Sequence, residues 1–538
     1  MSWICFDNDL EIPAIAAGMD FHAMVGMGSM LRNTGAFFMR RSFSSDKMYW
    51  EVFREYVRTL ITKYHSGVEF FLEGTRSRSC KALPPKIGLL SMLLEPFLKR
   101  KVFDILVVPV GVSYDRPIEE QLFAYELLGV PKPKESTSGL FKAFDIMDTC
   151  HGEIFVNFGA PMSLFDYFES NRSSVYWNPN EPKDPILTKD QLQSIGTLAR
   201  AVVDRQQRLY VLTTFNLIAV YFQYRSMVNL STNLNELKYG IDLLVKFLKN
   251  CDALLSCDLP SKKISNIIHS SLEIHSNILE FTSDQENASL RLVPRPRIAN
   301  TTSVDPKKLK GYALSAITMN NALPSIVLQC YANPCLYWLH QPAFYLLAQK
   351  MYVAKNEIAI EMYRMKQIFM NEFITQNVAS IETLEESIAF WERLHIARNT
   401  ELSNLLLASI VPFIFCYFNI VDVIKTQLCQ CHFTEKELYV KVQMHVENKL
   451  NANANYIHPY CLSLDSITNA MHSFVTNRYL IKKSATINDK TVIHYHVNQL
   501  SMINEIFSHL HDYCSNLQQF NGLANYLIFS KINKEKVE

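Results

Sequence analysis

Short apolar runs alternate with amphipathic stretches through residues 11–160, and this alternation constrains the fold more than any other feature of the chain. Residues 48–64 place Phe53, Val57 and Leu60 on one face of a helix. The strand-like runs are residues 12–17, 36–39, 68–72, 103–114 and 152–158, and a second helical segment lies at residues 87–94. Strands separated by helices are typical of a mixed or mainly parallel sheet flanked by helices, so the sequence predicts an α/β domain.

The remainder of the chain has a different pattern. Residues 165–187 are polar and contain several prolines, which is typical of a linker, and helical periodicity dominates after it. We therefore expect an α/β domain over residues 1–164, a linker over 165–187 and a mainly α-helical region over 188–538. The longest apolar run, residues 405–421, is at the short limit for a membrane span, and the sequence favours a buried helix pair kinked at Pro412.

Composition and charge exclude several classes of protein. The chain has 48% hydrophobic and 20% charged residues, which is ordinary globular usage and excludes a disordered chain. With 53 basic and 52 acidic side chains its net charge is +1, so we do not expect nucleic acid as a partner. The 12 cysteines show no disulfide spacing, which favours a reducing compartment. Cys429, Cys431 and His432 lack the second ligand pair of a zinc site, so we expect no metal and no cofactor.

The strongest chemical signal is a short motif in the N-terminal third of the chain. An apolar run ends in Glu73, and Gly74 then permits a tight turn. Arg76 and Arg78 follow between hydroxyl side chains, and two guanidiniums at a strand end can hold a phosphate through forked hydrogen bonds. Residues 75–101 contain seven basic side chains and one acidic side chain. An anion site and a solvated basic face are both consistent with this pattern.

Two further blocks have a structural and a functional interpretation. The aromatic run at residues 35–39 ends in Arg40 and Arg41, which fits either an anion contact or an edge strand closed by charge against aggregation. Residues 103–114 are typical of one long buried strand, in which Pro109 indicates an edge position or a bulge. On its own, each block is explained without a ligand.

In order and spacing, the three blocks resemble those of the glycerol-phosphate and dihydroxyacetone-phosphate acyltransferase family. Residues 16–21, 35–41 and 125–136 are most similar to the dihydroxyacetone-phosphate branch, which starts ether-lipid synthesis. The resemblance implies an acyltransferase domain that moves an acyl group from acyl-CoA to the hydroxyl of dihydroxyacetone phosphate, with glycerol 3-phosphate as the alternative acceptor.

The resemblance also implies roles for individual residues. Acyl transfer needs a cationic cradle for the phosphate, a base for the hydroxyl proton and donors for the developing oxyanion. Arg76 and Arg78 are expected to form the cradle, and Glu73 and Gly74 to shape the loop beneath it. The residues that the resemblance assigns to phosphate binding are Arg40, Arg41, Glu73, Gly74, Arg76 and Arg78, and the one in the block associated with acyl-CoA is Pro109.

The family's catalytic base is missing from its expected pattern. In the family this base is the His of a His-x-x-x-x-Asp block, yet none of the 15 His residues has Asp five positions later. A truncated isoform or an incomplete gene model is one explanation. A pseudoenzyme that binds phosphate or acyl-CoA, or that regulates an active acyltransferase, is the second, and an active site rewired to use His22 or His65 is the third. A membrane-surface adaptor that uses the basic residues of 75–101 is a further alternative.

The resemblance implies a membrane-associated, peroxisomal protein that works with a partner enzyme of ether-lipid synthesis. The chain ends in Lys536, Val537 and Glu538, which do not match a peroxisomal tripeptide of the Ser-Lys-Leu type. A mitochondrial or endoplasmic reticulum membrane is therefore the alternative expectation.

Overall fold

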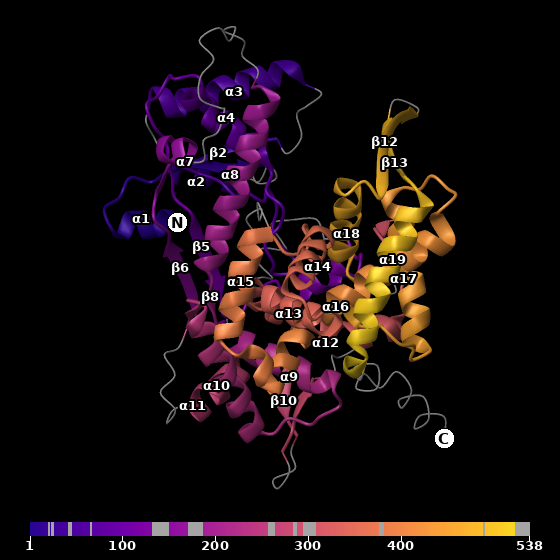
Figure 1. Cartoon of the computed structure of the whole chain (residues 1–538). Helices are drawn as coiled ribbons and strands as arrows, with labels where there is room; N and C mark the ends of the chain where they lie inside the picture. The colour runs from indigo at the N-terminus through magenta and orange to yellow at the C-terminus, as the bar shows by residue number, and fades with distance from the viewer. Residues whose placement is uncertain are drawn as a thin grey trace.

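Figure 1 shows the computed structural model of the chain, with an α/β part coloured indigo to purple beside a larger helical part coloured magenta to yellow. An α/β domain followed by a mainly α-helical region is therefore confirmed. The structure describes residues 1–19, 22, 26–40, 46–64, 67–131, 150–170, 187–256, 264–282, 288–293, 308–375, 381–487 and 490–521.

The α/β part is built around a three-stranded parallel sheet in the order β2-β1-β3. Ile15 pairs with Ala36 on one side, and Ala14 pairs with Val68 on the other. Two short antiparallel ladders, β4 with β7 and β5 with β6, complete the predicted mixed arrangement. The elements of this part are α1 (Ser2–Asp7), β1 (Ala14–Gly18), α2 (Met27–Asn33), β2 (Ala36–Met39), α3 (Lys47–Thr62), β3 (Val68–Glu69), α4 (Ile87–Leu98), β4 (Leu106–Val107), β5 (Val110–Tyr114), α5 (Glu120–Leu127), β6 (Ile154–Phe158), β7 (Met162–Ser163) and α7 (Leu164–Ser170).

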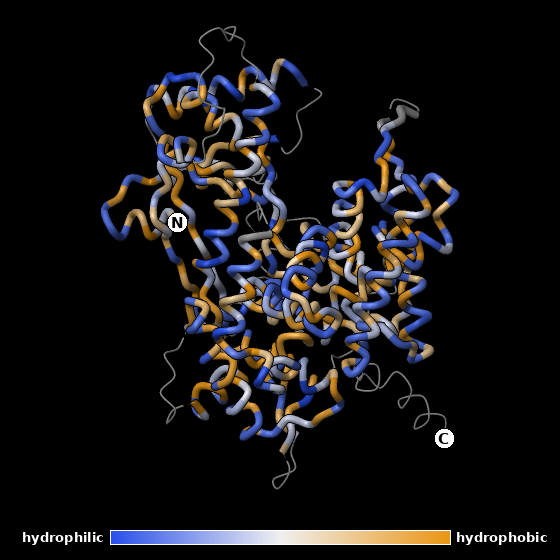
Figure 2. Tube along the Cα trace, viewed as in Figure 1, coloured by the Kyte–Doolittle hydropathy of each residue, from blue (hydrophilic) through white to orange (hydrophobic). Residues whose placement is uncertain are grey.

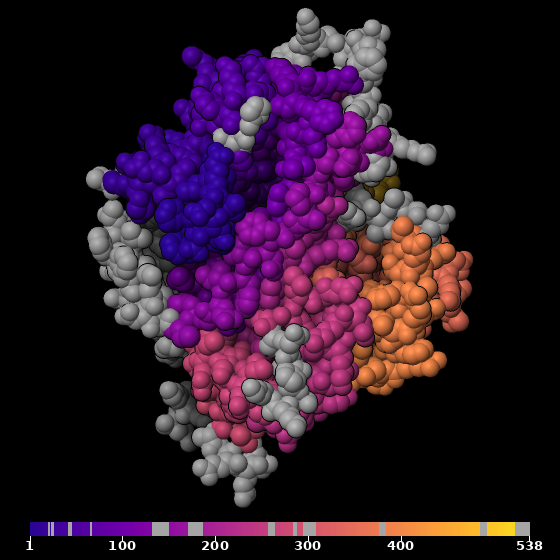
Figure 3. Space-filling view, turned by 90° about the vertical axis from the view of Figure 1, so that its left-hand side faces the viewer, coloured from indigo at the N-terminus to yellow at the C-terminus, as the bar shows by residue number. Residues whose placement is uncertain are grey.

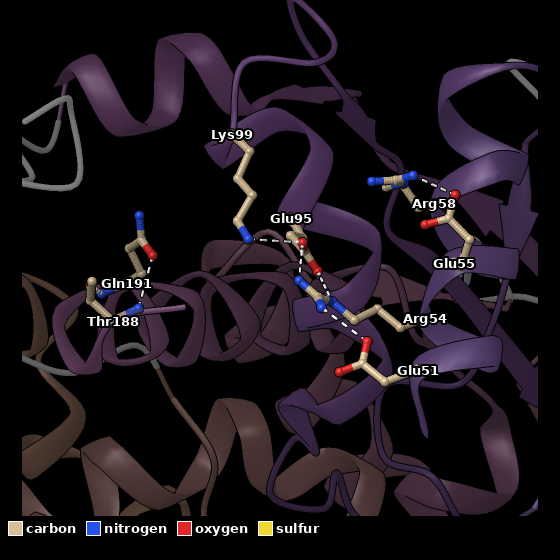
Figure 4. Close-up of polar contacts among 8 residues, drawn as sticks. All are labelled: Glu51, Arg54, Glu55, Arg58, Glu95, Lys99, Thr188 and Gln191. Atoms are coloured by element: carbon tan, nitrogen blue, oxygen red, sulfur yellow. Dashed lines mark hydrogen bonds and ion pairs between the residues drawn. The ribbon is translucent and has the colours of Figure 1, made fainter. Parts of the chain in front are cut away.

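Helices α3 and α4 pack beside the parallel sheet and share its core. Phe53 and Val57 of α3 are buried against Phe37 of β2 and Leu93 of α4, as the apolar face of residues 48–64 predicts. A buried ion pair joins the two helices, because the guanidinium of Arg54 donates through Nε to the Glu95 carboxylate at 2.6 Å (Figure 4).

The prediction of one long buried strand over residues 103–114 is wrong. The segment forms β4 and β5, which pair with different partners and are separated by Val108 and Pro109. Pro109 has no N–H to donate to a ladder, so the pairing breaks there, as its interpretation as an edge or bulge residue predicts. Leu106, Val108 and Tyr114 are exposed, so the strands are not buried on both faces.

The long helix α8 (Lys189–Arg208) connects the two parts, with its N-terminal half beside α4 (Figure 1). Thr188 and Gln191 cap its first turn by exchanging side chain to backbone hydrogen bonds, as Figure 4 shows. Residues 165–170 of the predicted linker belong to α7, and residues 171–186 lie outside the described residues. The predicted domain boundaries therefore stay a prediction.

The helical part encloses one large apolar core, and the tube in Figure 2 shows hydrophobic and hydrophilic residues alternating along its helices. In the space-filling view of Figure 3, the α/β part and the first helices of the helical part form one continuous surface. The helices of this part are α9 (Thr214–Met227), α10 (Leu234–Asn250), α11 (Ile264–Ile274), α12 (Ala316–Ala332), α13 (Leu336–Met351), α14 (Lys355–Ile368), α15 (Ile381–Arg393), α16 (Thr400–Val423), α17 (Glu435–Asn451), α18 (Leu464–Thr476) and α19 (Leu500–Asn516).

The longest apolar run lies in the centre of this core. Within the described ranges, Thr400–Leu428 is the one helix long and apolar enough to cross a membrane, and 89% of its apolar window is buried inside the protein. Burial of residues 405–421 is thus confirmed, but the expected pair of helices is wrong, because α16 continues through Pro412. Packing against α13, α9, α18 and α19 on several sides offsets the hydrogen bond that proline cannot make.

The helical part also contains short strands that the sequence pattern did not predict. The longest pair is an antiparallel hairpin, β12 with β13, in which Leu480 pairs with Val497; it projects at the upper right of Figure 1. The strands are β8 (Val211–Leu212), β9 (Leu254–Leu255), β10 (Leu279–Phe281), β11 (Leu290–Leu292), β12 (Leu480–Ile487) and β13 (Lys490–Val497).

Candidate functional site

The parallel sheet brings two of the predicted blocks to one edge. Strands β2 and β3 flank β1 and run parallel to it, so their carboxyl ends point the same way. Arg40 follows the last residue of β2, and residues 70–73 follow the end of β3. Ligands of α/β proteins commonly bind beyond the carboxyl ends of parallel strands. The sheet therefore places Arg40 and the segment that begins at Glu73, here called the motif loop (residues 73–81), at the edge where a ligand is expected.

The motif loop begins with a turn that requires glycine. Gly74 has φ of +66°, and its N–H donates to the carbonyl of Phe71 at 3.0 Å. A Cβ at this position would lie 3.0 Å from Cδ of Lys86, whose own N–H donates to the carbonyl of Leu72 at 2.8 Å. Both the backbone conformation and the close contact thus exclude a larger residue without rearrangement.

Glu73 is largely withdrawn from solvent beside this turn. Its Oε1 accepts a hydrogen bond from the N–H of Leu83 at 3.0 Å. Burial raises the pKa of Glu73 to about 7, and the Leu83 hydrogen bond opposes that rise. Near neutral pH a substantial fraction of Glu73 is therefore protonated, and a protonated carboxyl can donate a hydrogen bond to an anion.

The two arginines expected to form the phosphate cradle, Arg76 and Arg78, contact carboxylates at the two ends of α5. Arg76 donates to Glu119 just before this helix and lies 5.5 Å from the ring centroid of Phe123. Arg78 donates through Nε to Glu126 in the last turn. The Arg76 side chain is 50% exposed and the Arg78 side chain 30% exposed, so both can be reached from solvent. An incoming phosphate would compete with these two carboxylates for the guanidiniums.

Arg40 is held in a similar way at the end of β2. Its guanidinium donates to Asp46 at 2.8 Å and stacks 4.3 Å from the centroid of Tyr49. A hydrogen bond from the Tyr49 N–H, together with the one from Arg40, lowers the pKa of Asp46. Arg40 therefore keeps an ionised partner, and about half of its side chain remains exposed. Arg41 lies outside the described residues.

The end of the motif loop is fixed to the helical part. The Ser79 carbonyl accepts from Asn333 Nδ2 at 2.6 Å, and Lys81 forms a buried ion pair with Glu372. Ser77 Oγ and Ser79 Oγ are buried and have no hydrogen-bond partner in the part of the chain that the structure describes. These are two of the hydroxyl side chains that flank the arginines in the motif, and both hydroxyls are buried in the folded loop.

The basic character of residues 75–101 is smaller in the structure than in the sequence. Arg76, Arg78, Lys81 and Lys99 each form an ion pair with a carboxylate. Most of these carboxylates come from outside residues 75–101. Seven basic and one acidic side chain give this segment a net charge of +6, and the three carboxylates from outside it, Glu119, Glu126 and Glu372, offset half of that charge, which weakens its interpretation as a membrane-binding patch.

Pro109 does not belong to the motif loop. It is buried, and its carbonyl accepts the N–H of Gly159 at 2.8 Å. It therefore terminates the β5–β6 ladder, and its expected contact with acyl-CoA stays a prediction.

Of the two histidines considered as a replacement base, the structure describes His22, which has no carboxylate partner among the described residues. His22 is exposed, and its ring packs edge-on against Phe38 with centroids 5.4 Å apart. His65 lies outside the described residues. Within the described ranges, no three His, Cys, Asp or Glu side chains lie together as metal ligands would.

Sequence reasoning missed the acidic partners of the motif loop. Glu119 and Glu126 are 43 and 48 positions from their arginines, and Glu372 is 291 positions from Lys81. Asp465 of α18 is a further acid near Arg78 and Lys81, and burial raises its pKa against their influence. No local pattern marks these acids, although Glu126 falls in a block quoted for the family resemblance.

Two family models match the chain. The model described as "Acyltransferase" matches residues 1–113, and the model described as "Glycerol-3-phosphate acyltransferase C-terminal region" matches residues 123–483.

Individual proteins give the same result. "Dihydroxyacetone phosphate acyltransferase" of Oryctolagus cuniculus is 33% identical over 501 residues, which cover 90% of this chain and 70% of the relative. The protein of that name from Homo sapiens is 32% identical over 503 residues, covering 91% of this chain and 70% of the relative. "Glycerol-3-phosphate acyltransferase" of Pseudomonas fluorescens (strain SBW25) is 40% identical over 181 residues, covering 34% of this chain and 21% of the relative.

Proposed function

The chain belongs to the glycerol-3-phosphate and dihydroxyacetone-phosphate acyltransferase family, and from this premise we propose that it transfers an acyl group from acyl-CoA to the hydroxyl of dihydroxyacetone phosphate. The observation that carries this choice of acceptor is identity of 32–33% over about nine-tenths of the chain to relatives that bear that name. The bacterial glycerol-3-phosphate acyltransferases match a shorter part of the chain, so glycerol 3-phosphate is the alternative acceptor.

The motif loop supplies the phosphate contacts in this proposal. Arg76 and Arg78 exchange their carboxylate partners for the phosphate of the acceptor, and Arg40 assists from the end of β2. Glu73 in its protonated form donates a further hydrogen bond, and Gly74 allows the backbone to approach the ligand. Arg41 and Pro109 keep the roles that the family resemblance implies, phosphate binding and acyl-CoA binding.

The reaction replaces the thioester bond of acyl-CoA with an ester bond to the acceptor. The acceptor hydroxyl oxygen attacks the thioester carbonyl carbon, and the C–S bond breaks. A base accepts the hydroxyl proton and passes it to the CoA thiolate, which leaves. Positioning the acceptor by its phosphate holds the hydroxyl near the thioester, which lowers the entropic part of the barrier. The base is the unassigned component, and His22 and His65 are its candidates within these 538 residues.

A second candidate function is binding without turnover. It is favoured by one observation, the absence of a His with Asp five positions later among the 15 His residues. A chain of this kind would hold the phosphorylated acceptor or acyl-CoA and regulate an active acyltransferase. For either function we propose ether-lipid synthesis at a membrane, in the peroxisome or otherwise in mitochondria or the endoplasmic reticulum; cell fractionation with a tagged chain would test this location.

Acyl transfer by the purified chain separates the two candidates. Palmitoyl-CoA is offered with dihydroxyacetone phosphate or with glycerol 3-phosphate, and the lipid product is measured for the wild type and for Arg76→Ala/Arg78→Ala. The matched control is Arg291→Ala, which removes an exposed arginine paired with Glu280 in the β10–β11 hairpin. Turnover that the cradle variant loses and the control keeps supports the enzyme.

Three other results would each contradict a part of the proposal. Binding of the acceptor without turnover, abolished in the cradle variant, would favour the second candidate. Turnover that is the same in wild type and cradle variant would contradict the assigned phosphate contacts. Preference for glycerol 3-phosphate would reject the proposed acceptor and keep the family.

A further inference from the structure

A cationic cavity lies apart from the motif loop, between α8, α13 and α14. Its volume is about 300 Å³, at the small end of the range for ligand pockets. Arg200 of α8 and Lys366 of α14 line it, together with aromatic and polar side chains from α13, α14 and the segment after α14. In Figure 1 these three helices lie at the centre of the molecule, where the α/β part adjoins the helical part.

The two cations of this cavity have no acidic partner among its lining residues, which include no Asp or Glu within the described part of the chain. The acid whose charge reaches Lys366 is Asp204, one turn along α8 from Arg200. Asp204 is already engaged, because it accepts from the Tyr337 hydroxyl at 3.1 Å and from Arg208 Nε at 3.4 Å. Burial lowers the pKa of Arg200 and lowers that of Lys366 to about 8. Both cations are thus partly desolvated without a matching negative charge.

The remaining wall of the cavity is suited to a small polar ligand. His340 is buried, and its Nδ1–H donates to the Leu336 carbonyl at 2.6 Å, which leaves Nε2 as an acceptor. Burial also lowers the pKa of His340 to about 3, so the ring is neutral. It stacks on Phe373, with ring centroids 4.8 Å apart. Gln367 and Thr375 add neutral polar groups to the lining.

Two half-buried cations beside neutral polar groups are the composition of an anion site, since a buried charge is stabilised when an opposite charge joins it. We propose that this cavity binds the phosphate group of a small phosphorylated molecule, with Arg200 and Lys366 as its two charged contacts. The ligand is either a free phosphate ester or the phosphate-bearing end of CoA. The site is separate from the phosphate cradle and does not depend on the proposed reaction.

The cavity is connected to the motif loop through one short segment. Phe373 lines the cavity, whereas the preceding residue, Glu372, forms the ion pair with Lys81 of the motif loop. The carbonyl of Ile374 accepts from Gln207 of α8 at 2.6 Å, so this segment is fixed from both sides. The segment that lines the cavity therefore also holds the motif loop in place, through adjacent residues.

Calorimetric titration of the full chain tests the site. The Arg76→Ala/Arg78→Ala variant removes the cradle, and inorganic phosphate, glycerol 3-phosphate and CoA are titrated separately. We expect at least one of them to bind this variant with one equivalent, and binding to weaken at least tenfold on adding Arg200→Gln/Lys366→Gln. The matched control adds Arg291→Gln/Lys246→Gln instead, which removes two exposed cations, and it should bind as before.

The result also identifies the source of the phosphate. Binding of phosphate and glycerol 3-phosphate supports a free ester, and binding of CoA alone supports its phosphate-bearing end. Thermal melts verify that each variant folds. If the double substitution disturbs folding, the affinity of the Lys366→Gln variant is the deciding measurement, because this side chain on α14 is only half-buried. The proposal is overturned when none of the three ligands binds the cradle variant, or when Arg200→Gln/Lys366→Gln leaves the affinity unchanged.

Discussion

Lys81 of the motif loop forms a buried ion pair with Glu372, although the two residues lie 291 positions apart in the chain. The Lys81 side chain is 5% exposed and the Glu372 side chain is fully buried. Glu372 also accepts hydrogen bonds from the Ser466 hydroxyl at 3.1 Å and the Tyr417 hydroxyl at 3.3 Å. The position of a loop in the α/β part is thus set by α16, α18 and the segment after α14.

Removing the carboxylate of this pair should destabilise the protein strongly. Glu372→Gln removes the carboxylate that pairs with the buried Lys81 ammonium and leaves Asp465 as the nearby acid, and losing one partner of a buried ion pair typically costs about 3–5 kcal/mol. Lys81→Met/Glu372→Gln removes both charges and keeps an acceptor for Ser466 and Tyr417, so it should recover most of that loss. Denaturant and thermal unfolding of the wild type, both single variants and the double variant measure the cycle. A double variant as unstable as the sum of the singles would show that the charges do not interact.

Freeing the cradle arginines from α5 should strengthen phosphate binding. Glu119→Gln/Glu126→Gln removes the carboxylates that compete with a phosphate. The Arg76–Glu119 pair is exposed, whereas Glu126 is buried beside the partly exposed Arg78, and surface pairs contribute up to about 1 kcal/mol each. We expect glycerol 3-phosphate to bind about two- to tenfold more tightly, as measured by calorimetry. Glu280→Gln, which frees Arg291 in a distant hairpin, is the control and should change nothing. Weaker binding by the double variant would instead mean that the carboxylates orient Arg76 and Arg78 for the ligand.

Sequence periodicity was sufficient to predict the elements whose own residues show a clear apolar pattern. The apolar face of residues 48–64 predicts α3, and the aromatic run at residues 36–39 is β2. Pro109 correctly indicates a break in pairing, but the apolar residues on both sides of it suggested one continuous strand where the chain forms β4 and β5. The same limitation applies to residues 405–421, in which packing on several sides keeps α16 continuous through Pro412.

The candidate site was predictable only in its basic half. Arg76 and Arg78 stand in a recognisable motif, but the acids that pair with them lie just before and within α5, and the acid that binds Lys81 lies in the segment after α14. Tertiary packing determines those contacts, and the sequence around Glu119 or Glu372 shows no periodic pattern that would predict them. The cationic cavity was missed for the same reason, since Arg200 and Lys366 are distant in sequence.

The raised pKa of Glu73 gives the protein a pH dependence that a single substitution can isolate. The pKa is about 7 in the folded chain and near 4.5 when Glu73 is exposed, so its contribution to stability is complete below pH 4.5 and is lost as the pH rises through 7. Glu73→Gln mimics the protonated form and should show no such loss. Between pH 5 and 8, wild type should lose up to about 3 kcal/mol relative to the variant, since one pKa unit corresponds to about 1.4 kcal/mol. Melting temperatures across this range test it, and parallel curves would contradict a titrating Glu73.

The buried ion pair between α3 and α4 should respond to pH in the opposite sense. Burial acts to raise the pKa of Glu95, but hydrogen bonds from Arg54 and from Lys99 at 3.1 Å outweigh it, so the pKa lies below its usual value. The stabilisation is therefore present above about pH 4.5 and is lost as the pH falls through the lowered pKa. Glu95→Gln removes the buried carboxylate of Arg54 and leaves its 3.4 Å contact with the exposed Glu51 (Figure 4), so it should cost about 3–5 kcal/mol at pH 7.

Below about pH 4.5 the difference between wild type and Glu95→Gln should narrow, because Glu95 then takes up a proton on unfolding and is itself protonated once the pH falls through its lowered pKa. Unfolding of both chains in urea at pH 7 and at pH 3.5 measures the two differences. Glu55→Gln is the matched control, since Glu55 pairs with Arg58 on the exposed face of α3, and it should change stability by less than about 1 kcal/mol. An Arg54–Glu95 pair that clamps α4 to α3 requires the large effect at pH 7 and its reduction in acid. A small effect at both pH values would mean that apolar packing of Phe53 and Leu93 alone holds the two helices together.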